Sequence, residues 1–549
     1  MKYFPIILMA FAITLNAPAN AQFTRQDSLR GTINGMRSWW DVTRYEISVE
    51  PDFESKTIQG KNLIHFTATS NGHVMQIDLQ EPMFIDTVFI SHNKKQTPIP
   101  SKDIKREGNA YFIAVPSIKN GTKGILSISF HGKPRIANNP PWDGGWIWKK
   151  DKNGNPWMSV ACQGLGASVW YPCKDHQSDE PDNGASLTVI APDTLTVVGN
   201  GRLTNTHNVK PGKKSWTWNV TQPINNYNII PYIGKYATWQ EDYKGEKGLL
   251  SGNYWVLDYN IDKAKKQFGR DVPKTLKCFE EWFGPYPFYE DGFKLVESPH
   301  LGMEHQSAVA YGNQYKDGYL GMDLSGSGWG KKFDYIIIHE TGHEWFGNNI
   351  TTADIADMWV HEGFTSYSEV VFVECEFGKE AASEYCGGLR NNIANKEPVI
   401  GEYGVNKEGS GDMYPKGANL IHTIRQIIDN DAKFKSILRG LNKDFYHKIV
   451  TSADIEKYFE EKSGKKLGKI FDQYLRQSDL PVLEYKADGK KISCRWTKTV
   501  SGFDMPLRLA NSDKWINPTT EWKSFSVPSV SEFKIDKNFY ILTKKSSAQ

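Results

Sequence analysis

The pentad HETGH at residues 339–343 places two histidines four positions apart, with a glutamate beside the first. Side chains four positions apart lie on one face of a helix, so His339 and His343 can bind the same metal ion. Catalytic zinc takes three protein ligands and keeps one coordination position open for water. A glutamate next to a zinc ligand can accept a proton from that water. The pentad therefore predicts a metal-dependent hydrolytic site with Glu340 as the general base.

The third metal ligand is expected on a neighbouring helix. Glu362 follows His343 after eighteen intervening residues, within the apolar segment MWVHEGFTSY. An unpaired carboxylate buried in such surroundings is costly, and a bound cation would neutralise it. The alternative is an exposed glutamate on a solvated helix face. We predict that His339, His343 and Glu362 bind one Zn2+ ion per chain.

The middle of the chain must position these residues. Apolar residues recur there at helical spacing, and helices are predicted over 263–284, 333–347, 357–378 and 416–430. The second of these helices carries the pentad and is expected to end near Gly347. Gly342 costs about 1 kcal/mol in a helix relative to alanine, which suggests close packing at that position. The region 239–477 is therefore expected to be a mainly helical domain.

The flanking regions have the two-residue alternation of β-strands. Residues 22–238 contain six such segments and are predicted to form an all-β domain. Residues 478–549 contain further short segments of this kind and are predicted to form a small β-sandwich-like domain. The expected fold class is thus a multidomain α+β protein.

Composition and the first residues restrict the class of protein. A net charge of +3 and a pI near 8.2 are too balanced to indicate nucleic-acid binding. Residues 1–21 carry a lysine at position 2, continue with a short apolar run and end in Ala-Asn-Ala, which predicts a secretory signal peptide. We therefore expect an exported protein, periplasmic or secreted, with no stable membrane insertion after cleavage.

The cysteines leave their pairing open. Two local pairs, Cys162/Cys173 and Cys375/Cys386, are each eleven positions apart, and Cys278 and Cys494 stand alone. An exported protein can oxidise its cysteines, so buried thiols and one or two disulfides are both compatible with the sequence.

Several segments around the pentad resemble the M1, or gluzincin, family of zinc metallo-aminopeptidases. HEWFGNNIT is similar to the family's H-x-WFGN-x-x-T, and WVHEGFTSY to its W-x-x-EGF-x-x-Y. LGMEHQ resembles the exopeptidase segment G-x-MEN, and MYPKGANL resembles Y-x-KG. CQGLGASVWYPCKD is similar to the glutamine segment of the leukotriene A4 hydrolase branch. The resemblance implies a saddle-like N-terminal β domain and a thermolysin-like catalytic domain.

The resemblance also implies roles for individual residues. Tyr414 corresponds to the tyrosine that helps zinc stabilise the oxyanion. Glu304 corresponds to the glutamate that binds the α-ammonium group of the substrate, with Gln163 helping to hold the same group. Gly302 and Met303 would hydrogen-bond the peptide as an added strand. The expected substrates are peptides with a free N-terminus.

The sequence departs from the family pattern at two positions and in length. His305 and His361 each replace an asparagine, and we interpret both as residues that support the site without binding metal or acting as base. Because histidine usually titrates near neutral pH, these two residues could make the activity of the site depend on pH. Many relatives carry a large helical domain after the catalytic one, whereas only short strands follow here, which suggests a more open cleft.

Two other functions remain compatible with these residues. One is epoxide hydrolysis at the same zinc site, which the glutamine segment allows. The other is peptide binding without catalysis, which the presence of the complete set of ligands and base disfavours. A thermolysin-type endopeptidase is disfavoured by the segment GMEH.

Overall fold

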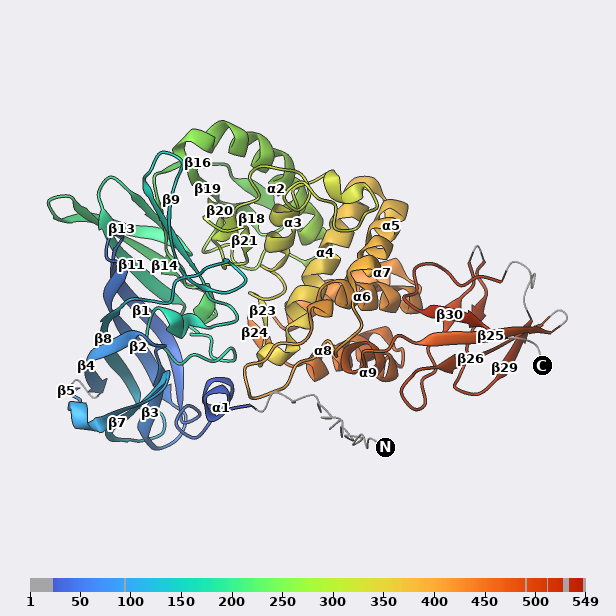
Figure 1. Ribbon diagram of the computed structural model, residues 1–549, viewed down its shortest axis with the longest axis horizontal. Coiled ribbons are helices and arrows are strands. Elements are labelled where there is room, and N and C mark those ends of the chain that lie inside the picture. The colour runs from blue at the N-terminus through green and yellow to red at the C-terminus, as the bar shows by residue number, and fades with distance from the viewer. Residues whose placement is uncertain (1–22, 93–94, 489–490, 511, 527–532, 547–549) are drawn as a thin grey trace, which may run out of the picture.

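The computed structural model describes residues 23–92, 95–488, 491–510, 512–526 and 533–546, so the predicted signal peptide at 1–21 lies outside the described residues. Three regions follow one another along the long axis of the molecule (Figure 1). Strands come first, helices occupy the middle, and a smaller group of strands lies at the other end. The expected multidomain α+β class is therefore confirmed.

The N-terminal region is built on an eight-stranded sheet in the order β13-β14-β11-β1-β2-β8-β4-β5. Its central strands are β1 (Trp40–Asp52) and β2 (Thr57–Ala68), which pair antiparallel. Residues alternate between buried and less buried positions along β1, as the sequence predicts for a strand with one face in the core. The central pair is flanked by β11 (Ala185–Pro192) and β14 (Lys213–Val220) on one side and by β8 (Lys123–Gly132) and β4 (Met83–His92) on the other, and the edge strands are β13 (Arg202–Lys210) and β5 (Lys95–Pro98).

A smaller sheet of the same region leads toward the middle of the molecule. Its order is β12-β15-β10-β9, and β9 (Gly145–Lys150) pairs antiparallel with β10 (Pro156–Ala161). The other two strands are β12 (Thr196–Val198) and β15 (Tyr232–Gly234). The chain leaves β10 just before Gln163, so the end of this strand sets the position of that side chain.

The middle region combines a five-stranded sheet with packed helices. The sheet order is β16-β19-β20-β22-β21, which makes β21 (Gly302–Met303) an edge strand that pairs, among the described residues, only with β22 (Val309–Tyr311). The other strands are β16 (Tyr236–Gln240), β19 (Gly252–Leu257) and β20 (Phe293–Glu297). The helices nearest the pentad are α2 (Ile261–Phe283), α3 (Tyr335–Gly342), α4 (Trp359–Phe377) and α6 (Pro415–Ile428).

The helix that carries the pentad is shorter than predicted. It was expected to reach Gly347, but α3 ends at Gly342 and His343 caps it in a helical conformation. The backbone N–H of Phe346 still donates to the carbonyl of Gly342 at 3.2 Å, and Gly347 has a φ of +127° that a helix cannot contain. Turns therefore replace the last helical turn, while both histidines keep their helical spacing.

Helices α3 and α4 lie in close contact at Gly342. A Cβ atom at this position would lie 2.3 Å from the Ser368 hydroxyl oxygen and 3.2 Å from the Thr365 methyl carbon. Only glycine leaves room for α4 there, which accounts for a residue that is unfavourable in a helix. The residues of α4 from Trp359 to Val373 are all buried, so each polar side chain in that stretch needs a partner inside the protein.

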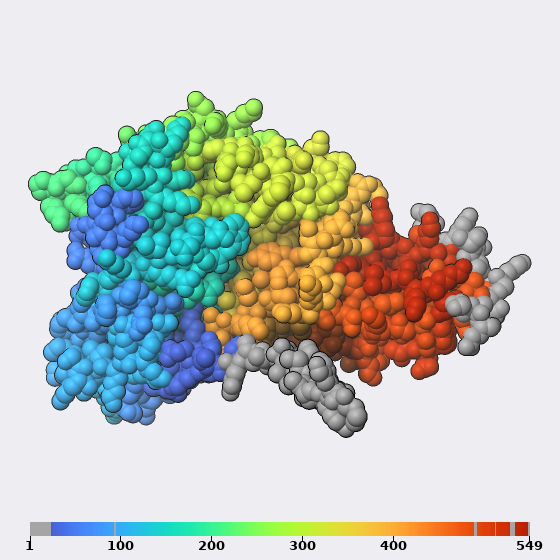
Figure 2. Space-filling model, in the orientation of Figure 1, coloured from blue at the N-terminus to red at the C-terminus, as the bar shows by residue number. Residues whose placement is uncertain are grey.

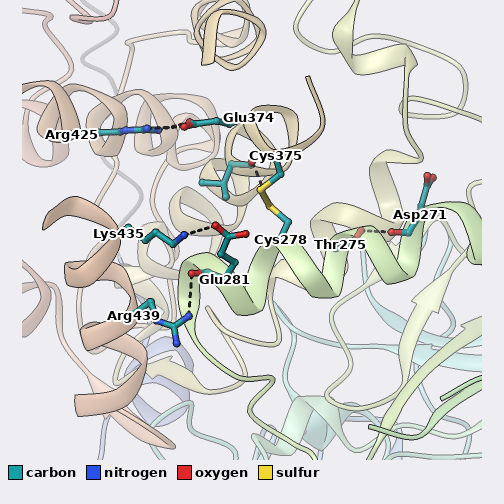
Figure 3. Close-up of a disulfide and its surroundings, with 10 residues drawn as sticks. Asp271, Thr275, Cys278, Glu281, Glu374, Cys375, Arg425, Lys435 and Arg439 are labelled. Atoms are coloured by element: carbon teal, nitrogen blue, oxygen red, sulfur yellow. Dashed lines mark hydrogen bonds and ion pairs between the residues drawn. A yellow bond between two sulfur atoms is a disulfide. The ribbon is translucent and has the colours of Figure 1, made fainter. Parts of the chain in front are cut away.

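A disulfide between Cys278 and Cys375 joins α2 to α4 (Figure 3). The two residues are 97 positions apart, and their Cα atoms lie 6.2 Å apart. Neither local cysteine pair forms a bond, since Cys162, Cys173 and Cys386 are free and buried. Long-range packing rather than sequence proximity therefore selects the disulfide.

The C-terminal region forms a four-stranded sheet in the order β29-β26-β25-β30. Its two central strands, β25 (Val482–Asp488) and β26 (Lys491–Thr497), pair antiparallel. The edge strands are β29 (Lys523–Ser526) and β30 (Leu542–Lys545), and a separate two-stranded sheet accompanies them. Across the described part of the chain, no helix is both long enough and apolar enough to cross a membrane.

Candidate metal centre and active site

The three predicted ligands meet at one point in the middle region. The Nε2 atoms of His339 and His343 lie 3.3 Å apart. Glu362 Oε2 lies 3.3 Å from the Nε2 of His343 and 3.6 Å from that of His339. All three residues are buried, at 6%, 1% and 3% exposure respectively. Three donor atoms thus form a nearly equilateral triangle in the interior.

This triangle fits a zinc ion. Zinc–nitrogen and zinc–oxygen bonds of about 2.0 to 2.2 Å in a tetrahedron separate ligand atoms by about 3.3 to 3.6 Å. Glu362 Oε2 is buried without a hydrogen-bond partner among the described residues. A cation bound at this point would satisfy the orphaned oxygen and offset the cost of burying the carboxylate.

The ring of His339 is held in place by Glu369. Its Nδ1 atom lies 2.6 Å from Glu369 Oε1, and the Tyr385 hydroxyl donates to Glu369 Oε2 at 2.7 Å. A proton on Nδ1 leaves the lone pair of Nε2 free for a metal. The Tyr335 ring also stacks on His339, with the ring centroids 5.2 Å apart.

The ring of His343 is fixed by the turn that follows α3. Its Nδ1 atom donates to the backbone carbonyl of Phe346 at 3.0 Å and lies 3.1 Å from the Thr365 hydroxyl. Because α3 ends at Gly342, the turn that follows it can bring the carbonyl of Phe346 to the ring of His343. Both imidazoles therefore direct Nε2 toward Glu362.

Two carboxyl groups of the centre have opposite pKa shifts. Burial would raise the pKa of Glu362, but the adjacent imidazoles, His343 foremost, hold it below its ordinary value. Burial raises the pKa of Glu340 to about 7, and the two histidines only partly oppose this effect. Glu340 is thus suited to accept and release a proton near neutral pH, whereas Glu362 stays ionised.

Glu340 faces the edge strand β21. A Cβ atom at Gly302 would lie 2.6 Å from Glu340 Oε1, so glycine is the residue that lets this carboxylate reach the strand. The pairing of β21 with β22 leaves its other edge without a strand among the described residues. The backbone of Gly302 and Met303 is therefore available for an extended ligand beside Glu340.

Glu304 directly follows β21 in the chain and lines the cavity. It is 3% exposed, and Gln163 Nε2 and the Tyr227 hydroxyl both donate to its Oε1 atom, the latter at 2.9 Å. Its Oε2 atom accepts no hydrogen bond from the described residues. Burial raises the pKa of Glu304 above its ordinary value. One carboxylate oxygen is thus fixed by the N-terminal region while the other remains available to a cationic ligand.

Tyr414 lines the same cavity as the metal ligands. It precedes α6, and Pro415 occupies the first turn of that helix. The ring of Tyr414 stacks against His339, with the centroids 6.1 Å apart. Burial raises the pKa of Tyr414 well above its ordinary value, so its hydroxyl keeps the proton and can donate a hydrogen bond.

The metal ligands, Glu340, Glu304, Gln163, Glu369, Tyr414 and the edge strand β21 line one cavity of about 570 Å3. Figure 2 shows the surface recessed where the teal region near residues 141–164 meets the yellow and orange helical region. The described lining residues include five glutamates and no lysine or arginine: Glu304, Glu340, Glu362, Glu369 and Glu408. The cavity is therefore built for positively charged ligands.

The two histidines that depart from the family pattern do not titrate near neutrality. His305 is fully buried, and its Nδ1 atom lies 2.5 Å from the Tyr232 hydroxyl. His361 accepts from the backbone N–H of Thr352 at 2.9 Å. Burial lowers the pKa of His361 to about 3 and that of His305 well below its usual range. Both are neutral supports of the site, which answers the question of their pH dependence.

The structure brings every predicted site residue to this cavity, and it adds residues that the sequence reading missed. Glu369 lies seven positions after Glu362, which is two helical turns, so both face the same side of α4. A glutamate within that apolar stretch was a signal available in the sequence. Tyr227 and Thr365 carried no such signal, because each is selected by contacts with distant segments.

Comparison with known proteins identifies similar sequences across both main regions. The model described as the Peptidase M1 N-terminal domain matches residues 42–227, and the Peptidase family M1 domain matches residues 270–474. "Probable aminopeptidase 2" of Sulfurisphaera tokodaii is 23% identical over 472 residues, covering 82% of this chain and 55% of that protein. Human "Aminopeptidase B" is 26% identical over 350 residues, covering 59% of this chain and 50% of that protein. The chain thus spans about half the length of the curated relatives it matches.

Solved structures show the same architecture. A substitution variant of an M1 zinc metallopeptidase from Deinococcus radiodurans, bound to a Tyr-Ser-Ala substrate, aligns with a TM-score of 0.67 at 18% identity. The alignment covers 81% of this chain and 96% of that one. At this identity the similarity establishes the fold, and the chemistry rests on the site itself.

Proposed function

The chain belongs to peptidase family M1, and from this premise we propose that it is a zinc-dependent aminopeptidase that removes the N-terminal residue of peptides. One observation carries the proposal. A buried triangle of zinc-type donors and the buried carboxylate of Glu304 line the same cavity, on either side of Glu340. The triangle of donors suits metal-dependent hydrolysis, and the Glu304 carboxylate suits binding of a free amino terminus.

His339, His343 and Glu362 would hold the zinc ion. When bound, zinc would lower the pKa of a coordinated water and polarise the carbonyl of the scissile bond. Glu369 and the Phe346 carbonyl keep the two imidazoles in the tautomer that presents Nε2.

Glu340 would act as the general base and then as the acid. Its carboxylate accepts a proton from the attacking water and returns it to the leaving nitrogen of the peptide bond. The pKa of about 7 lets it perform both transfers near neutral pH. The Tyr414 hydroxyl, which keeps its proton, would donate to the oxygen that becomes negatively charged during the attack.

The substrate would be held from its amino end. The free Oε2 of Glu304 accepts a charge-assisted hydrogen bond from the α-ammonium group, and Gln163 orients this carboxylate through Oε1. The open edge of β21 at Gly302 and Met303 would pair with the backbone of the peptide. A blocked amino terminus lacks the charge that Glu304 requires, so the arrangement favours exopeptidase over endopeptidase cleavage.

We further propose that the protein is exported, periplasmic or secreted. The support for this is the sequence of residues 1–21, with its short apolar run and Ala-Asn-Ala end. Cell fractionation with detection of the mature N-terminus tests it, and retention of residues 1–21 in a cytoplasmic fraction would contradict it.

A panel of fluorogenic amino-acid amides tests the catalytic proposal. We expect cleavage of amides with a free amino group, none of their acetylated forms, and loss of turnover on zinc removal. Glu304→Ala should lower kcat/KM by about ten- to 150-fold, since hydrogen bonds to charged groups contribute about 1.5 to 3 kcal/mol. Equal cleavage of acetylated amides would refute the role of Glu304, and no cleavage of any amide with zinc present would refute catalysis. The same panel reveals the preferred first side chain.

A further inference from the structure

A second cavity lies apart from the catalytic one and has a different character. Its volume is about 730 Å3, and it lies between the end of α2 and helix α7 (Asp431–Asp444). No described residue lines both cavities. Its apolar walls come mainly from Phe283, Pro285, Pro287 and the ring of Tyr446.

Positive side chains border this groove. Lys435, Arg439 and Lys443 follow one another at steps of four on α7, so they form a row along one side of the helix. Lys247 comes from the turn between β17 (Tyr243–Gly245) and β18 (Gly248–Leu250), with its Nζ atom 5.0 Å from the centroid of the Tyr446 ring. The lining contains no aspartate or glutamate among the described residues.

Two of these cations are neutralised from outside the groove. Lys435 pairs with Glu281 at 2.5 Å, and Arg439 donates to the Glu281 carbonyl at 3.0 Å (Figure 3). Arg439 also pairs with Glu246 at 2.9 Å. These contacts fix the two side chains across the end of α2, so they form a rigid part of the wall.

The other two cations have no such partner. Lys247 and Lys443 are exposed, and neither forms an ion pair with a carboxylate in the described part of the chain. They therefore leave uncompensated positive charge beside an apolar hollow. Phe283, at 1% exposure, lies at its buried end. Apolar surface of this kind, next to unpaired charge, is typical of a ligand site rather than of an ordinary surface.

We propose that this groove binds a small amphiphilic anion, with its aromatic or aliphatic body against Pro285 and the ring of Tyr446 and its single acidic group between Lys247 and Lys443. The cavity volume lies within the range of about 300 to 1,000 Å3 typical of small-molecule sites. The absence of acidic lining residues selects a negative head group, and the apolar wall selects against a fully hydrated anion such as free phosphate. The proposal concerns a site that takes no part in peptide hydrolysis, so it stands independently of the proposed function.

Anilinonaphthalene sulfonate is a suitable probe, because it joins two aromatic units to one sulfonate. Titration of the full chain, followed by fluorescence, should give one saturable site. The affinity should weaken as salt is raised, because salt screens the exposed lysines. The uncharged parent compound phenylnaphthylamine should bind with little dependence on salt.

Charge reversal locates the site. Lys247→Glu with Lys443→Glu should raise the Kd of the sulfonate by at least about tenfold and leave that of phenylnaphthylamine nearly unchanged. Lys105→Glu with Lys119→Glu is the matched control, since both lysines are exposed in the N-terminal region and carry the same change in charge. This control should bind the sulfonate as the unaltered protein does.

A steric variant tests the apolar part. Ser436 is exposed on the groove side of α7, and Ser436→Trp should fill the hollow and abolish binding of both compounds. Thermal unfolding of each variant shows that it is folded. Sulfonate binding that is the same in the groove pair and the control pair would overturn the proposal, as would undiminished binding in a folded Ser436→Trp variant.

Discussion

Glu369 provides the sharpest test of how this chain prepares its metal centre. The side chain is 1% exposed, and its Oε1 atom lies 2.6 Å from the Nδ1 of His339. Glu369→Ala removes this partner, and Glu369→Gln keeps an acceptor of nearly the same shape without the charge. We expect the alanine variant to weaken zinc binding and the glutamine variant to weaken it less.

The magnitude follows from the contact. A buried hydrogen bond to a charged group contributes about 1.5 to 3 kcal/mol, which corresponds to roughly ten- to 150-fold in a dissociation constant. Partners of metal-bound histidines typically change metal affinity by about 10- to 100-fold. We therefore expect the zinc Kd to rise about 10- to 100-fold in Glu369→Ala and by less than about tenfold in Glu369→Gln.

Competition with a fluorescent zinc chelator measures this Kd directly, and thermal unfolding checks that each variant is folded. Glu376→Gln is a matched control, because it makes the same chemical change on the same helix at a side chain that pairs with Lys274 at the surface. It should leave zinc affinity unchanged. An unaltered zinc Kd in a folded Glu369→Ala variant would refute the argument that Glu369 orients His339.

Three further outcomes are expected. Glu340→Gln should retain zinc and lower kcat by about two to four orders of magnitude, because general acid–base catalysis typically contributes about that much. Full activity of this variant would contradict the assignment. Burial raises the pKa of Glu180, which accepts from Thr351 at 2.6 Å, to about 8. The contribution of Glu180 to stability should therefore fall as pH rises from about 4.5 through 8, so Glu180→Gln should be more stable than the wild type by roughly 2 to 4 kcal/mol at about pH 9 and show no gain near pH 4.5 in denaturant titrations. Replacing Cys278 and Cys375 with serine opens a 97-residue loop, which should cost about 4 to 5 kcal/mol and lower the midpoint of thermal unfolding, and an unchanged midpoint would argue against the bond.

Much of the fold could be read from local patterns. The alternation along β1 and β2 and the helical spacing in α2, α4 and α6 identify these elements, because each buries one face or is buried throughout. The end of α3 could not be read in this way. The turn after Gly342 is set by contacts of Phe346 and His343, which depend on where α4 lies.

In the candidate site, too, some residues could be recognised from short spacing, and others are brought together only by long-range packing. The spacing from His339 and His343 to Glu362 could be recognised because all three lie within 24 consecutive residues, on one helix and the start of the next. Gln163 and Tyr227 reach Glu304 from positions 141 and 77 residues away, so their contact depends on how the N-terminal sheets pack against the middle region. The disulfide of Cys278 and Cys375 depends on packing in the same way.

The sequence by itself determined the order of strands and helices and predicted the ligand set and the general base, since these follow from residue type and short spacing. Only the tertiary structure decided which groups orient the ligands, which cysteines pair and why Gly342 lies inside the pentad. Its hydrogen atom faces Ser368 of α4, where a Cβ atom would lie 2.3 Å from the hydroxyl oxygen. Such contacts join segments that approach one another only after the chain has packed, so no local pattern contains them.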